Sequence, residues 1–297
     1  IVHFADKITE KTKETGAPLC LGLDPHKNLI PDLFKKKLNQ LYLSDIEDFL
    51  FEIINLAKGK VAALKPQVAF FEEWGPEGFS LLAKISRFAK DLDFPIIIDA
   101  KRGDIGSTSE AYANAWLGDN SHFYADALTV NPWMGLETID PFIETAKEKG
   151  KGIFILLKTS NPGSKDIQSL EINGESVFLK ISRLIKENLP LNLGKSGYSN
   201  IGIVVGATKP KEAELIRKIL PNHLFLVPGF GAQGGIAEDA LSGLIFNENI
   251  YEGGLINSSR SILFPKDAFE AQKLQDWRKI IGVSLQKSLD ELKVNVY

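Results

Sequence analysis

The sequence predicts an α/β protein folded as a single closed (β/α)₈ barrel, the TIM-barrel class, and three observations carry this prediction. Eight short apolar runs alternate with longer segments of helical periodicity along the 297 residues. Several runs, such as IIID, FILL and IVVG, are apolar on both faces, which is typical of parallel strands covered on both sides. The length suits one barrel of about 250 residues with extensions. We therefore expect residues 1–297 to form one domain, with an open doubly wound sheet as the alternative.

The first expected element is a helix within residues 1–15, where acidic and basic side chains recur at helical spacing. We expect it to lie on the surface and not to be a signal peptide. Each later apolar run stops at or near Gly, Pro, Asp or Asn, which end strands. The strands are expected at 19–23, 61–65, 95–99, 127–130, 152–157, 201–205, 224–227 and 254–257. Helices are expected at 45–58, 76–91, 107–118, 136–149, 175–187, 209–220 and 267–292, a shorter helix within 235–247, and loops at 160–174 and 194–200.

Composition excludes several classes of partner. The net charge of −3 gives no electrostatic reason to expect nucleic acid or an anionic membrane as a partner. The single cysteine, Cys20, has no partner for an internal disulfide and is expected to be a small core residue in a reducing compartment. No apolar run approaches the roughly 20 residues that a membrane-spanning helix needs. These features predict a cytoplasmic protein.

Charged and polar residues recur where the predicted strands end. Each one taken alone is more simply a solvated loop residue, but the active site of a (β/α)₈ barrel lies at this edge. As a set at one rim they favour an active site over a random surface. They are Asp24, Lys65, Asp99 with Lys101 and Asp104, Asn131, Ser160 and Arg260.

The segment DAKRGD places charge inside the barrel mouth. Alternate side chains along a strand share a face, so Asp99 and Lys101 should point inward together. Lys65 should point inward by the same parity, and Asp104 should complete a Lys–Asp–Lys–Asp network in one cavity. The alternative is a structural salt-bridge network. Because buried ion pairs are weak stabilisers, a cluster of four at a barrel mouth favours function.

Residues 229–234 spell GFGAQG, which matches the glycine pattern of dinucleotide-binding folds. That interpretation fails, because the pattern belongs to a first strand–helix unit and needs an acid at the end of the next strand. Here it follows the seventh strand, and the eighth is followed by SSRS. The loops after strands seven and eight bind phosphate in barrels, so Gln233 in the glycine-rich loop and Arg260 in SSRS are expected to hold a phosphate. A plain flexible turn is the alternative.

Residues 99–108, DAKRGDIGST, resemble the signature D-x-K-x-x-D-I-x-x-T of the orotidine monophosphate decarboxylase family, particularly its larger bacterial branch. The resemblance extends over nearly the whole chain. Related sugar-phosphate decarboxylases share D-x-K-x-x-D but act with Mg²⁺, so a metal-dependent barrel lyase or isomerase acting on a sugar phosphate is the alternative. The similar segments are GLDP at 22–25, LKPQ at 64–67, TVNPWMG at 129–135, LLKTSNPGS at 156–164, VVGAT at 204–208, VPGFGAQGG at 227–235 and NSSRSI at 257–262.

The resemblance implies conversion of orotidine 5′-monophosphate (OMP) to UMP, the last step of de novo pyrimidine biosynthesis, without a cofactor. It implies that Lys101 delivers the proton to C6 and that Asp99 lies against the substrate carboxylate, with Lys65 and Asp104 completing the charged network. It also implies a homodimer in which Asp104 and Thr108 serve the partner's site. The implied substrate-binding residues are Asp24, Lys65 and Thr108 for the ribose, Ser160 for the pyrimidine, and Gln233 and Arg260, with the adjacent Ser259, for the phosphate.

No metal site is expected. The four histidines, at 3, 26, 122 and 223, share no ligand spacing, and each is expected to be a surface or satisfied loop residue. A noncatalytic nucleotide-binding barrel is a further alternative. Such a protein would tolerate loss of Lys101 or Asp104, and both are present.

Overall fold

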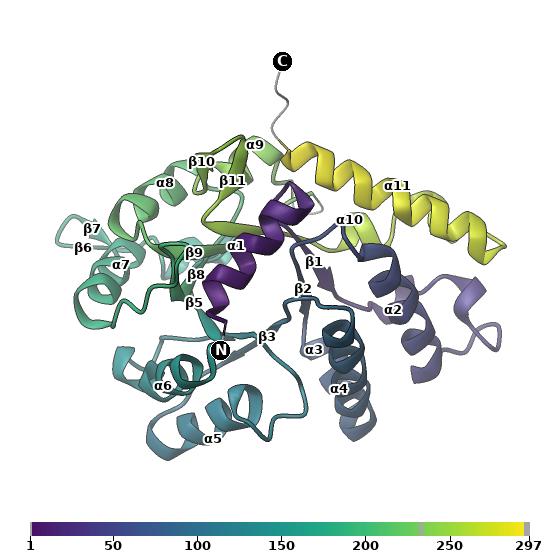
Figure 1. Cartoon of the computed structure of the whole chain (residues 1–297), viewed down its shortest axis with the longest axis horizontal. Helices are drawn as coiled ribbons and strands as arrows, with labels where there is room; N and C mark the ends of the chain where they lie inside the picture. The colour runs from purple at the N-terminus through teal and green to yellow at the C-terminus, as the bar shows by residue number, and fades with distance from the viewer. Residues whose placement is uncertain (1, 232–233, 294–297) are drawn as a thin grey trace.

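A computed structural model describes residues 2–231 and 234–293. Eight strands of the described residues form one parallel sheet in the order β2-β1-β12-β9-β8-β5-β4-β3. Its two edge strands meet at a sparsely bonded seam, where the Leu64 N–H donates to the Pro95 carbonyl at 2.9 Å and the Val68 N–H donates to the Asp99 carbonyl at 3.2 Å. The sheet is therefore a nearly closed barrel surrounded by helices (Figure 1). This confirms the predicted class and excludes the open sheet.

The element bounds follow the apolar runs closely, because both faces of each strand are buried. The prediction matches β1 and β4 at both ends and the other strands within two or three residues. The strands are β1 (Leu19–Leu23), β2 (Ala63–Pro66), β3 (Ile97–Arg102), β4 (Ala127–Val130), β5 (Gly152–Lys158), β8 (Ser199–Val205), β9 (His223–Val227) and β12 (Gly254–Ser258). The main outer helices are α2 (Leu43–Ala57), α4 (Gly75–Asp91), α5 (Gly106–Leu117), α6 (Asp140–Lys149), α7 (Val177–Asn188), α8 (Pro210–Ile219) and α11 (Leu274–Leu292).

The core has two parts. A large cluster of Leu, Ile, Val and Phe side chains packs between the strands and the outer helices. A smaller apolar cluster fills the interior of the barrel toward the amino ends of the strands, and Cys20 belongs to it, as expected. Burial raises the pKa of the Cys20 thiol to about 12, so this thiol is a core group and not a nucleophile. Among the described residues, no helix is both long and apolar enough to cross a membrane.

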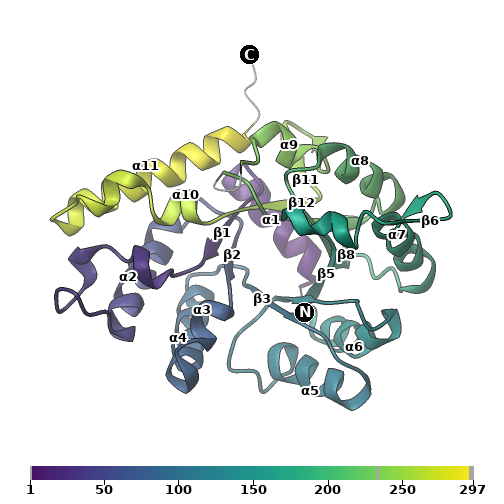
Figure 2. The same cartoon turned by 180° about the vertical axis from the view of Figure 1, so that it is seen from behind.

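The amino-terminal helix α1 (Phe4–Thr15) was expected on the surface, and its outer side, with Glu10, Lys13 and Glu14, is exposed, but its apolar side is buried, which was not expected. It lies across the amino-terminal end of the barrel, and the two views show it from opposite sides (Figures 1 and 2). Phe4, Ala5 and Ile8 are at most 1% exposed, and the Phe4 ring meets Phe154 edge-on at 5.8 Å between centroids. A Cβ added to Gly152 would lie 2.2 Å from that ring, so glycine makes the contact possible. In the sequence, the charged residues of the outer face outnumber a narrow apolar stripe on the inner face. This stripe packs into the amino-terminal end of the barrel and closes it.

The other departures are local. The expected loop at 160–174 contains a short strand, β6 (Glu171–Ile172), which pairs with β7 (Glu175–Ser176) and delays the start of α7. The expected helix within 235–247 is only α9 (Ala237–Leu241). A hairpin follows it, β10 (Ile245–Asn247) with β11 (Ile250–Glu252). Its turn residues Glu248 and Asn249 both have positive φ, a turn type that the sequence analysis did not recognise.

The buried side chain of His223 is expected to make the stability of the fold depend on pH. Its side chain is 6% exposed, and Nδ1 has no hydrogen-bond partner among the described residues. Burial, assisted by the nearby charge of Arg217, lowers its pKa from 6.5 to about 4. The unfolded chain therefore takes up a proton at a higher pH than the folded protein does. Stability is retained above pH 6.5 and is lost as the pH falls from 6.5 toward 4.

We expect this proton to cost up to about 3 kcal/mol of unfolding free energy by pH 4, at about 1.4 kcal/mol per pKa unit. His223→Gln should remove that part of the pH dependence between pH 6.5 and 4.5, as measured by urea unfolding. His122 is exposed, so His122→Gln is the matched control and should leave the slope unchanged. A His223→Gln variant with the wild-type slope would contradict the assignment.

Candidate active site

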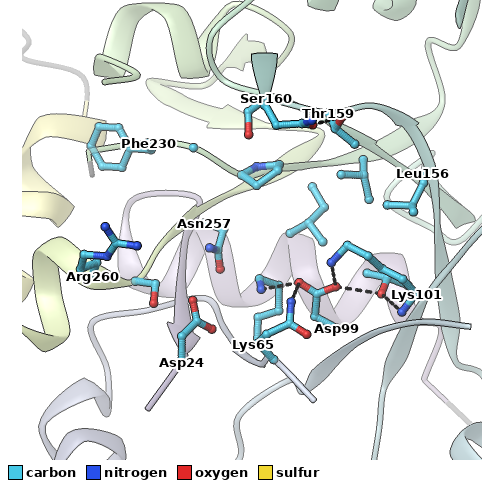
Figure 3. A pocket seen from close by; sticks show the side chains of 18 of the residues that line it. Asp24, Lys65, Asp99, Lys101, Leu156, Thr159, Ser160, Phe230, Asn257 and Arg260 are labelled. Carbon is cyan, nitrogen blue, oxygen red and sulfur yellow. Dashed lines mark hydrogen bonds and ion pairs between the residues drawn. The ribbon is translucent and has the colours of Figure 1, made fainter. Parts of the chain in front are cut away.

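A cavity of about 330 Å³ opens at the carboxyl ends of the strands, where the charged residues were expected. Charged groups occupy its two ends, with Lys101 at one end and Arg260 at the other (Figure 3). Apolar side chains such as Leu156, Val204 and Leu226 form part of the wall between them. The polar lining consists of Asp24, His26, Lys65, Gln67, Asp99, Lys101, Thr129, Thr159, Ser160, Asn161, Asn257, Ser259 and Arg260.

Asp99 is the centre of the charged end. Lys65 Nζ lies 2.7 Å from one carboxylate oxygen, Oδ2, and Lys101 Nζ lies 2.6 Å from the other, Oδ1. The Gln67 amide also donates to Oδ2 at 3.1 Å, and the Thr129 hydroxyl donates to Oδ1 at 3.0 Å. Four donors from three strands and the turn after β2 therefore hold one carboxylate in a fixed orientation.

The electrostatics keep this cluster ionised. Burial by itself raises the pKa of Asp99, but the ammonium groups of Lys65 and Lys101 outweigh it and hold that pKa well below its usual value. Burial likewise lowers the pKa of Lys65, but attraction by Asp99 and Asp24 outweighs it and raises that pKa above its usual value. The site is thus a fixed array of charges before any ligand binds, which is the arrangement that electrostatic catalysis requires.

Lys101 reaches Asp99 through an irregular backbone. Its φ is 50°, in the left-handed region, and the pairing of β3 with β4 shifts register between Ile98 and Arg102. The Lys101 N–H donates to the Thr129 hydroxyl at 2.9 Å, which stabilises the bulge. Such a backbone costs about 1–3 kcal/mol and persists where the surrounding structure imposes it. The bulge leaves the Lys101 side chain 44% exposed at the mouth, accessible to a ligand.

Between the charged cluster and Arg260, three buried oxygen atoms of the cavity have no hydrogen-bond partner among the described residues. They are Asp24 Oδ1, Asn257 Oδ1 and Ser259 Oγ. Asn257 is 8% exposed and lines the cavity near Asp24 (Figure 3). Buried oxygens of this kind normally have partners, so a ligand with hydroxyl donors would satisfy them.

Arg260 is the first residue of the short helix α10 (Arg260–Leu263) and is exposed at the cavity rim. The glycine-rich loop after β9 lies beside it, and Gly229, Gly231 and Gly234 all have positive φ, between 79° and 101°. Only glycine adopts this backbone readily, and it brings N–H groups close to a ligand. Gln233, expected here from the sequence, lies outside the described residues.

Asp104 and Thr108 do not line this cavity. Asp104 Oδ1 accepts the N–H of Ile105 at 2.8 Å, and Thr108 is exposed near the start of α5. After β3 the chain passes close to Asn131, where a Cβ added to Gly103 would lie 2.8 Å from the Asn131 carbonyl oxygen. The expectation that four charges meet in one cavity is therefore wrong for the single chain. Lys65, Asp99 and Lys101 come together, and Asp104 does not.

Several lining residues were missed in the sequence. Thr129 shares strand parity with Ala127 on the barrel interior, and Gln67 follows Lys65 by two residues, so alternation could have found both. The assignment of each histidine to the surface or a satisfied loop is wrong for His223, which is buried on β9 and whose Nδ1 has no partner among the described residues. His26 is a loop residue, as expected, but its place in the cavity was missed. It lines the cavity with its ring 4.4 Å from that of Phe70, and burial together with Arg260 lowers its pKa. Within the described ranges, no group of three or more His, Cys, Asp or Glu side chains could hold a metal ion.

A (β/α)₈ barrel with a Lys–Asp–Lys array at its mouth, in which Lys65 and Asp99 are buried, defines the general class, a barrel enzyme with a charged active site. The sequence model of the "Orotidine 5′-phosphate decarboxylase / HUMPS family" matches residues 17–274. The chain belongs to this family, which confirms the resemblance seen in the sequence.

Similar proteins support the same assignment over nearly the full length. The orotidine 5′-phosphate decarboxylase of Rhodopirellula baltica is 36% identical over 304 residues, covering 99% of this chain and 100% of the relative. That of Clostridium tetani is 42% identical over 264 residues, covering 87% of each. The structure of Leishmania donovani OMP decarboxylase has a TM-score of 0.73 and 29% identity, covering 96% of this chain and 100% of that one.

Proposed function

We propose that the protein decarboxylates OMP to UMP, using only its own side chains. The observation that carries this proposal is the Lys65–Asp99–Lys101 array, with a half-exposed ammonium at one end of a cavity whose other end carries Arg260. Family membership and the names of the relatives supply the reaction. The side chains that line the cavity are the groups with which this chain would carry out that reaction.

In the proposed reaction the bond between C6 and the carboxylate breaks, and its electron pair remains on C6. The resulting vinyl-type carbanion has no conjugated electron sink, so the barrier is high. The Lys101 ammonium stabilises this charge as it develops and then gives C6 its proton, while CO₂ leaves. Solvent then restores the proton to Lys101, and the reaction is balanced.

Electrostatic magnitudes limit what repulsion can contribute. Two unit charges about 4 Å apart interact by about 4 kcal/mol at an effective dielectric constant near 20. Repulsion between Asp99 and the substrate carboxylate therefore supplies only a fraction of the roughly 8–23 kcal/mol by which enzymes lower barriers. Attraction between Lys101 and the charge on C6 grows during the reaction, so it stabilises the transition state more than the ground state. Phosphate binding far from C6 holds the base in this unfavourable position.

The remaining groups suit the rest of the nucleotide. We assign the ribose hydroxyls to Asp24, Lys65 and the previously missed Asn257, because buried acceptors there have no donor. Ser160 lies at the rim over the cavity and is assigned to the pyrimidine. Arg260, with Ser259, Gln233 and the glycine-rich loop, is assigned to the phosphate.

The direct test is loss of OMP absorbance on mixing with pure protein in EDTA. We expect full turnover to UMP, because Lys101 and Asp99 perform the proposed steps without a Lewis acid. The competing function is a metal-dependent lyase or isomerase acting on a sugar phosphate. Activity that disappears in EDTA and returns with Mg²⁺, or that requires a phosphate without a base, would support that function instead.

Arg260→Gln should lower kcat/KM for OMP by roughly a hundredfold, because a charge-assisted bond to phosphate is worth about 3 kcal/mol. The loss should be much smaller for orotidine, which lacks the phosphate. Arg87→Gln, on the outside of α4, is the matched control. Equal losses for OMP and orotidine would mean that Arg260 does not bind the phosphate.

A further inference from the structure

Lys158 is a buried cation that the proposed reaction does not use. It is the last residue of β5, its side chain is 1% exposed, and it does not line the cavity. The next three residues, Thr159, Ser160 and Asn161, do line it. Burying an ammonium group is unfavourable, and an apolar residue of similar size often serves stability equally well. The position of this charge therefore points to a role other than stability.

The Lys158 ammonium joins three elements. Nζ donates to the Ser169 hydroxyl at 2.6 Å, lies 3.6 Å from Glu212 Oε2 on α8, and lies 5.2 Å from the ring centroid of Phe178 on α7. Glu212 Oε2 is itself buried and has no hydrogen-bond partner among the described residues. The Lys158 ammonium is thus the counter-charge of Glu212. Its hydrogen bond to Ser169 connects the segment that ends at Ser169 to this charge pair.

Ser169 closes a segment that is held mainly by hydrogen bonds, among them one from the Phe178 N–H on α7 to the Gln168 carbonyl at 3.0 Å. We name residues 159–169 the rim segment. Between 161 and 169 only Ser164 is buried, so packing contributes little. Its two ends are joined by polar contacts, since the Thr159 N–H donates to Gln168 Oε1 at 2.9 Å and Gln168 Nε2 donates to Thr159 Oγ1 at 3.0 Å. A segment with few buried side chains depends on such bonds for its order.

We propose that Lys158 is a positioning residue that holds the rim segment in place, so that Ser160 and Asn161 face the cavity before substrate binds. Lys158 acts through Ser169 and does not touch the substrate. The effect on substrate binding rests on the proposed function. The effect on the order of the rim segment does not.

Two variants separate this role from a general loss of stability. Ser169→Ala removes the contact to the rim segment and leaves both charges in place. The double variant Lys158→Met with Glu212→Gln removes the charge pair without leaving either charge buried alone. Lys7→Met is the matched control, because Lys7 is a partly buried lysine paired with Asp126 at 2.8 Å near the amino ends of the strands.

We expect both variants, but not Lys7→Met, to increase amide hydrogen exchange in residues 160–170 while the melting temperature stays near the wild-type value. KM for OMP should rise about tenfold with little change in kcat, as expected for loss of one charge-assisted bond in the unliganded site. Unchanged exchange in both variants would overturn the proposal, as would a rise in exchange over the whole chain. If wild-type protein does not turn over OMP, the proposed function fails, and the exchange measurement still tests the position of the rim segment.

Discussion

Lys101→Ala is expected to lower kcat for OMP by about four orders of magnitude or more while the fold is retained. Proton delivery by a positioned acid contributes up to about 10⁴, and loss of the preorganised cation adds to this. The fold should survive because the side chain is 44% exposed, so truncation opens no internal cavity. Asp99 keeps Lys65, Gln67 and Thr129 as donors and is not left as an unpaired buried charge.

The measurement is turnover of OMP by protein purified from a host without its own decarboxylase, together with binding of UMP. UMP binding should persist in Lys101→Ala, which shows that the site is intact. Lys165→Ala is the matched control, because Lys165 is an exposed lysine near the mouth that does not line the cavity. A loss below about a hundredfold, smaller than general acid catalysis usually contributes, would remove Lys101 from the role of sole proton donor.

Asp104→Ala is expected to abolish turnover although Asp104 lies outside its own chain's cavity. The motivation is the family resemblance, which implies that Asp104 and Thr108 serve the partner's site. The chain leaves β3 at Arg102 and directs Asp104 and Thr108 away from the mouth, beside Ile105, which is 61% exposed. We propose that both residues reach the active site of a second copy in a homodimer, completing a charged network of which the single chain holds three members.

Mixing inactive Lys101→Ala chains with inactive Asp104→Ala chains tests this arrangement. In a mixed dimer one site collects both defects, while the other takes Lys101 from one chain and Asp104 from the other and is intact. Random exchange makes half of the dimers mixed, so about a quarter of wild-type activity should return if the sites are independent. Exchange that is verified by mass but restores nothing above the two parents would assign Asp104 to its own chain.

The barrel was predictable because its strands are buried on both faces and appear as continuous apolar runs, whose ends coincide with the charged residues of the mouth. Strand parity was enough to place Asp99 and Lys65 inside. Parity also predicted that Lys101 lies beside them. The position of Lys101 is set, however, by a bulge with positive φ, which strand parity does not describe. Local pattern describes regular strands, and a bulge depends on the neighbouring strand, here through Thr129.

By itself, the sequence determined the fold class, the family and the charged residues of the mouth, because these depend on periodicity and on motifs a few residues long. Only the tertiary structure decided that α1 closes the barrel, that Asn257 carries an unsatisfied oxygen in the cavity, that Asp104 turns away, and that Lys158 is buried against Ser169 and Glu212. Each of these four features depends on contacts between residues that are far apart in the sequence. Packing and desolvation between elements set that pairing, and no periodicity within one element encodes it.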